Sequence, residues 1–130
     1  MSPLVLTFSL RVKPAGKERP RVTKRGTTYM PKEYEVWRSM VAWMVRSQVP
    51  AAILPRLPLT SRLAFACTVS VPRGDMRPDL DNLVGAVWDS IQVPTKGGWG
   101  LILNDKQFKR LIAEVIDGPT CIRFTISEIA

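Results

Sequence analysis

Two aspartates separated by one residue, Asp79 and Asp81, stand in the segment Arg77-Pro78-Asp79-Leu80-Asp81-Asn82. A third, Asp105, follows in Leu103-Asn104-Asp105-Lys106. Carboxylate oxygens are the ligands that Mg²⁺ prefers, and two or three of them with waters and a phosphate complete its six-oxygen shell. A metal held in this way activates water for attack on a phosphodiester and neutralises the leaving oxygen. The three aspartates are therefore candidate metal ligands and candidate catalytic residues.

The rest of the chain is basic, with 19 Lys and Arg against 11 Asp and Glu among 130 residues, a formal net charge of +8. A positive surface attracts nucleic-acid phosphates, whereas clustered carboxylates repel them unless a divalent cation lies between. The chain also has no histidine, which excludes histidine-based nucleophilic triads and a histidine general base. A basic chain that also clusters carboxylates indicates a protein that binds nucleic acid and cuts it with a metal.

Each aspartate also has an ordinary structural explanation, as a helix cap or a turn residue. Asn82 after the pair, together with the electropositive setting, favours the metal site. The apolar spacing of residues 80–92 predicts a helix, so that Asp79 precedes it and Asp81 lies in its first turn. Asp105 can join the pair if the Gly-rich connector 94–104 folds back over the start of this helix.

A basic segment interrupted by Gly and Pro, KPAGKERPRVTKRGTTYMP, occupies residues 13–31. Lys24-Arg25-Gly26 between short β-prone pieces predicts the tip of a loop or hairpin. Many such runs are only solvated charged loops, but the small amount of apolar anchoring favours an arm that faces phosphates. The candidate DNA-binding residues are Lys13, Lys17, Arg19, Arg21, Lys24 and Arg25.

Hydrophobic periodicity predicts the elements that position these residues. Period-two alternation indicates strands at residues 4–12, 62–72, 111–115 and 122–126, the last two joined by a hairpin turn at 117–119. Spacings of three and four predict helices over 32–48 and 80–92. The order favours an α+β fold: residues 1–130 form a single domain, a mixed sheet with two helices packed on it.

Two further expectations concern the cellular setting. Cys67 and Cys121 lie far apart in strand-like apolar runs, so we interpret both as small buried residues in a reducing compartment. The apolar start at residues 4–8 is too short to span a membrane.

The segment RPDLDNL, followed by an apolar stretch and then ND, resembles the RusA family of Holliday-junction resolvases, the crossover junction endodeoxyribonucleases. The family pattern is D-x-D-N at the head of a helix, then a D-D or N-D pair after a loop. The amino-terminal part, KPAGKERPRVTKRGTTYMPKEYEVW, is similar to the family's basic start. The resemblance covers nearly the whole chain, and D-x-D-N is its most specific part.

This resemblance implies a homodimeric, magnesium-dependent endonuclease, in which Mn²⁺ can substitute, that makes paired nicks across a four-way DNA junction or other branched DNA. It implies a phage or prophage type that acts in the bacterial cytoplasm, at the nucleoid. By position, Asp79, Asp81 and Asp105 correspond to the family's metal-binding carboxylates.

Two positions depart from the family pattern. Asn104 stands where some members have a fourth aspartate, and Gly85 stands where members often carry a lysine, one turn after the second aspartate. Lys106 and Lys17 are candidate substitutes, and Lys96 is a weaker one. A non-catalytic module that binds branched DNA with the same fold is the alternative. Gly85→Lys is expected to raise turnover unless another backbone or Lys106 fills that space.

Overall fold

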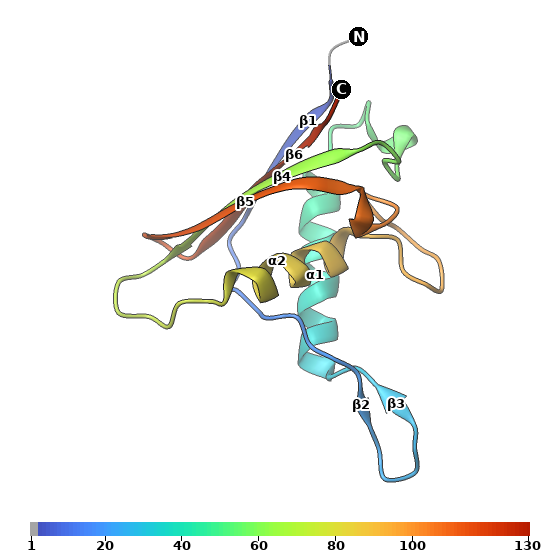
Figure 1. The fold of residues 1–130 in the computed structure, drawn as a ribbon, viewed down its shortest axis with the longest axis vertical. Helices are drawn as coiled ribbons and strands as arrows, with labels where there is room; N and C mark the ends of the chain where they lie inside the picture. Colours follow the sequence, from blue (N-terminus) through green and yellow to red (C-terminus); the bar gives the residue numbers. More distant parts are fainter. Residues whose placement is uncertain (1–2) are drawn as a thin grey trace.

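Four strands form a mixed sheet in the order β1-β6-β4-β5 in the computed structural model, which describes residues 3–130 (Figure 1). The strands are β1 (Val5–Leu10), β4 (Leu63–Val71), β5 (Phe108–Asp117) and β6 (Cys121–Glu128). Strands β1 and β4 both run antiparallel to β6, and β4 runs parallel to β5. A parallel pair needs a crossover connection, which helix α2 (Leu80–Ile91) supplies here. The α+β class with two helices on a mixed sheet is confirmed.

Strict alternation in β1, β4 and β6 buries one face of the sheet. Phe8, Phe65 and Phe124 form its centre, with ring centroids 5.0 Å apart for Phe8 and Phe124 and 5.2 Å apart for Phe65 and Phe124. The opposite face carries small and hydroxylated side chains that are exposed or half-buried, among them Thr7, Ser9, Ala66, Thr68 and Thr125. The two helices therefore cover one face of the sheet and leave the other accessible.

Helix α1 (Lys32–Gln48) has the bounds that the apolar spacing predicts. Pro31 precedes it, where the missing amide hydrogen costs nothing. Its buried residues are Tyr34, Trp37, Val41 and Val45. The wider apolar face in the sequence is not covered within one chain, because Val36 is 58% exposed and Trp43 is 71% exposed. Helix α2 buries the expected stripe, which includes Leu83, Val84, Val87 and Ile91.

The prediction that the last two strands form a hairpin is wrong. Strands β5 and β6 do not pair, because β4 lies between them. Their connection crosses the end of β4, where the Gly118 N–H donates to the Val71 carbonyl at 3.1 Å. Gly118 has a φ of +158°, and a Cβ there would lie 2.9 Å from Ser70 Oγ, so the crossing favours glycine. Strand β4 takes the central place because its alternate side chains are all buried, whereas β5 leaves Leu111 and Ile112 exposed at the edge.

The basic segment forms the predicted hairpin, made of β2 (Arg21–Val22) and β3 (Thr28–Tyr29), and it extends away from the sheet and helices (Figure 1). Gly26 at its tip has a φ of +83°, which suits glycine. Two short 3₁₀ helices, η1 (Leu54–Arg56) and η2 (Asp105–Gln107), lie in the connectors.

Both cysteines are free thiols, and they differ in position. Cys67 is buried in the core, whereas Cys121 is half-buried on the uncovered face of the sheet. Across residues 3–130, none of the helices combines the length and the apolar character that crossing a membrane requires.

Candidate metal and nucleic-acid site

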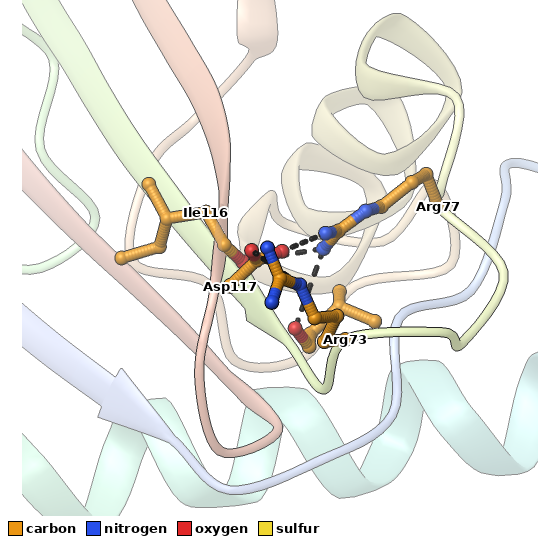
Figure 2. A network of polar contacts seen from close by, with 5 residues as sticks. Arg73, Arg77, Ile116 and Asp117 are labelled. Atoms are coloured by element: carbon orange, nitrogen blue, oxygen red, sulfur yellow. Dashed lines mark hydrogen bonds and ion pairs between the residues drawn. The ribbon is translucent and has the colours of Figure 1, made fainter.

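An arginine clamp holds the loop that leads from β4 to the aspartate pair (Figure 2). Arg77 forms an ion pair with Asp117 and donates hydrogen bonds to the carbonyls of Val71 at 3.3 Å and Ile116 at 3.4 Å. Arg73 also approaches Asp117, at 3.9 Å. The loop is thereby tied to the carboxyl ends of β4 and β5, immediately before Pro78 and Asp79.

The two aspartates lie together at the head of α2. Asp79 is the N-cap residue, and its carbonyl accepts from the Leu83 N–H at 2.9 Å. Its side chain does not cap the helix and instead accepts from Asn82 Nδ2 at 3.2 Å. Asp81 follows in the first turn. Both carboxylates are exposed and free to take another ligand.

The two carboxyl groups titrate as an interacting pair. A hydrogen bond with Asp81 raises the pKa of Asp79 above its ordinary value, and partial desolvation and the negative charge of Asp81 raise it further. The same hydrogen bond lowers the pKa of Asp81. Such a contact between like charges is relieved by a proton or by a cation between the groups. Adjacent hard oxygen donors at a helix N-terminus fit Mg²⁺ or Mn²⁺.

Asp105 lies at the opposite end of α2 from the aspartate pair. Its N–H donates to Gln92 Oε1 at 3.3 Å, and Gln92 is the C-cap residue of α2. The 94–104 connector returns to this end of the helix, where Leu101 and Ile102 both donate to the Ile91 carbonyl. Asp105 is thus tied to the C-terminal end of α2, whereas Asp79 lies at its N-terminal end, and a helix of 12 residues is about 18 Å long. Among residues 3–130, no three His, Cys, Asp or Glu side chains are grouped to hold a metal.

A hollow of about 430 Å³ adjoins the aspartate pair. We call it the carboxylate hollow. Its charged and polar lining is Lys13, Asp75, Arg77, Asp79, Asn82 and Thr120, and its remaining lining is Pro14, Ala15, Gly16, Val71, Met76 and Pro78. Two basic and two acidic side chains thus line the hollow. A phosphate that enters it can meet Lys13 beside the candidate metal ligand Asp79.

Lys17 lies against α2 at Gly85, the position at which the family pattern often has a lysine. Its backbone N–H donates to the Asn82 carbonyl at 3.0 Å, and its aliphatic stem covers Gly85. Its Nζ is 3.4 Å from Asp89 Oδ1. Of the candidate substitutes for the missing lysine, Lys17 is therefore the one that reaches this position, whereas Lys106 stands beside Asp105 at the other end of the helix.

Asp89 also belongs to this region, although its sequence position did not mark it as a candidate site residue. It accepts from the Tyr34 hydroxyl of α1 at 2.8 Å as well as from Lys17, and only 11% of its side chain is exposed. Burial first, and then this hydrogen bond to Asp89, raise the pKa of Tyr34. Asp89 lies on the same polar stripe of the helix as Asp81, two turns later. This spacing in the sequence could have identified Asp89 as a residue near the site. Tyr34 and Asp89 together fasten the basic arm to both helices.

The remaining arm residues are exposed on the hairpin and the chain that leads to it. Arg19, Arg21, Lys24 and Arg25 form no ion pair within residues 3–130. Lys13 lines the carboxylate hollow. The structure thus brings Lys13 to the aspartate pair and the Lys17 ammonium to Asp89 further along α2. The other four lie on an extension that can reach along a polyanion.

The position of Lys17 reverses the expected effect of a lysine at residue 85. A Cβ at Gly85 would lie 3.1 Å from Lys17 Cδ, so Gly85→Ala requires only a small shift of a flexible stem. Gly85→Lys has to displace Lys17 and its contact with Asp89. We therefore expect Gly85→Lys and Lys17→Ala both to lower single-turnover nicking of a four-way junction, while Gly85→Ala and Lys106→Ala stay near the parent rate. A gain in rate for Gly85→Lys would contradict this placement of Lys17.

These features define a small α+β protein with a carboxylate pair at a helix head, set among basic side chains. A comparison with protein families matches residues 11–127 to endodeoxyribonuclease RusA. The chain belongs to the RusA family, the family of the Holliday junction resolvase RusA. A comparison with curated proteins found no match.

Proposed function

We propose that this protein is a divalent-metal-dependent endonuclease that resolves four-way DNA junctions by paired nicks. The observation that carries the proposal is the contact between Asp79 and Asp81 at the head of α2. The pair lies beside a hollow whose other charged side chains are Lys13, Asp75 and Arg77. The family supports endonuclease action on Holliday junctions, and the site supplies residues suited to it.

In this proposal, Asp79 and Asp81 would hold Mg²⁺ or Mn²⁺. The bound ion would activate water for in-line attack and neutralise charge on the leaving oxygen. Asn82 orients the Asp79 carboxylate through its 3.2 Å hydrogen bond. Lys13 would hold a neighbouring phosphate, Arg77 keeps the loop before Asp79 in place through Asp117, and Lys17 fixes the arm against α2. The exposed cations of the hairpin grip an arm of the junction.

We propose further that the protein acts as a homodimer and that Asp105 serves the site of the partner. Asp105 and the aspartate pair lie at opposite ends of α2, so one chain does not unite them. A two-fold axis that sets two α2 helices antiparallel would bring the Asp105 of each copy to the aspartate pair of the other. The two sites of such a dimer match the two-fold symmetry of a four-way junction.

Mixed dimers test this arrangement. Asp81→Asn and Asp105→Asn are each expected to be inactive as homodimers. If Asp105 acts in the partner's site, a heterodimer of the two variants contains one intact site and one doubly altered site. Mixing and subunit exchange should then restore single nicks without paired nicks. If the mixture stays as inactive as its components while exchange is verified, Asp105 does not act across the dimer.

Nicking of a synthetic junction tests the function itself. We expect cleavage at symmetrically related positions in Mg²⁺ and in Mn²⁺, none in EDTA, and little on a linear duplex of the same sequence. Tight binding to the junction without nicking in either metal would favour the non-catalytic module, for which Gly85 and Asn104 are the supporting residues.

A further inference from the structure

A second basic hollow lies on the uncovered face of the sheet. Its volume is about 490 Å³, and we call it the arginine hollow; its lining is Ser9, Arg11, Ser70, Pro119, Thr120, Cys121 and Arg123. Two of these side chains are guanidinium groups, three are hydroxyls and none is acidic. This lining is suited to an anion rather than to an apolar ligand.

The sheet register fixes the positions of the two arginines. Arg123 of β6 stands opposite Ser9 of β1 and opposite Thr68 of β4, so its side chain belongs to the uncovered face. Arg11 follows the end of β1 two residues after Ser9, on the same side of the chain. The Ser9 amide and carbonyl are both bound by Gln48 of α1, at 3.0 and 2.9 Å. The strand end that carries Arg11 is therefore tied to the helix layer.

Neither arginine has a carboxylate partner. The ion pairs within residues 3–130 use Lys17, Arg56, Arg73 and Arg77, and none includes Arg11 or Arg123. Glu114, the next acidic side chain beyond Thr68 in the cross-strand row, accepts from the Thr68 hydroxyl at 3.2 Å. Two like charges that line one hollow without counter-charges favour a bound anion. The fork of a guanidinium matches the geometry of a phosphate.

The arginine hollow adjoins the carboxylate hollow, because Thr120 lines both of them. The turn between β5 and β6 forms the ridge that they share. A DNA strand with its scissile phosphate at Asp79 can therefore continue across Thr120 into the arginine hollow. No aromatic side chain lines the arginine hollow, so it suits contact with the sugar-phosphate backbone rather than with bases.

We propose that Arg11 and Arg123 form a phosphate-binding subsite that holds the DNA backbone beside the scissile phosphate. The subsite rests on the proposed function for its ligand, the phosphodiester of the cleaved strand. It extends the DNA-binding surface from the basic arm onto the uncovered face of the sheet, and it fixes the direction in which the strand leaves the site.

Binding in EDTA separates this subsite from catalysis. Arg123→Ala and Arg11→Ala should each lower junction affinity about 5- to 10-fold at 0.1 M salt and reduce the slope of log K against log salt by about 0.9. Arg110→Ala is the matched control, because Arg110 is exposed on β5 outside the hollow. A slope for Arg123→Ala equal to that of the parent, or a reduction that Arg110→Ala reproduces, overturns the subsite.

Neutral methylphosphonates, placed one at a time on either side of the cut, locate the contact. At one position near the cut, Arg123→Ala should cause no further loss of affinity, whereas Arg110→Ala should bind each of these substrates with the affinity of the parent. The absence of any such position overturns the subsite. Inorganic phosphate that raises the Tm of the parent but not of Arg123→Ala, with no change in DNA slope, would assign the hollow to the free anion. A parent protein that binds DNA through this subsite but never nicks a junction would refute the proposed function alone.

Discussion

Asp81→Asn should abolish junction cleavage and leave junction binding intact or tighter. In the proposed site this carboxylate contributes to holding the metal. The loss of several kcal/mol of metal-derived stabilisation of the transition state would correspond to a rate lower by about 10³-fold or more. Binding should persist because removal of a negative charge beside a phosphate lowers repulsion. The variant should fold normally, since Asp81 is exposed and makes no hydrogen bond with a side chain outside its pair. Single-turnover nicking and binding in EDTA measure the two effects separately.

Glu33→Gln is the control for the loss of one negative charge, because Glu33 is exposed in the first turn of α1. It should cut the junction at the parent rate. If Asp81→Asn loses binding and cleavage in equal measure while its circular dichroism is unchanged, the aspartate pair is not a metal site.

Junction affinity should fall steeply with salt. The arm offers six candidate cations, and a protein that makes 6–10 phosphate contacts loses roughly 10³–10⁵ in affinity between 50 and 200 mM salt. Arg19→Ala and Arg21→Ala should each flatten the slope by about 0.9, the value for one contact. Both side chains are exposed, so neither change should lower the free energy of unfolding appreciably.

Arg56→Ala is a suitable comparison for the arm variants, because Arg56 already approaches Glu128 at 4.0 Å in the connector before β4. Its slope should match that of the parent. A parent slope near zero would mean that the basic arm does not bind phosphates, and a function unrelated to nucleic acids would then be favoured.

Local patterns in the sequence were sufficient to predict the two helices and the core strands of this fold. The bounds of α1 follow from apolar residues at spacings of three and four after Pro31, and the buried face of β4 follows from strict alternation. The position of Asp79 and Asp81 at a helix head follows from the apolar stripe that starts at Leu80. Each of these depends on residues within one or two turns of each other, where side-chain period decides the structure.

The arrangement of distant segments could not be predicted in the same way. Sequence neighbours often pair, but β4 lies between β5 and β6. Strand β4 buries every alternate side chain and leaves most of the others only half exposed, whereas β5 is largely exposed at the edge of the sheet. The connector before Asp105 binds the C-terminal end of α2 through Leu101 and Ile102, which local composition does not reveal. Lys17 covers Gly85 only because the arm doubles back along α2.

The central claim is best tested on a supercoiled plasmid that extrudes a cruciform from an inverted repeat. Paired nicks across the four-way junction, made within one binding event, convert this plasmid to a linear product. We predict that the parent protein gives linear DNA in Mg²⁺, that EDTA or Asp81→Asn leaves the plasmid supercoiled, and that a plasmid without the repeat is not cut. No linear product in Mg²⁺ or Mn²⁺, or equal cutting of the plasmid without the repeat, would contradict the account.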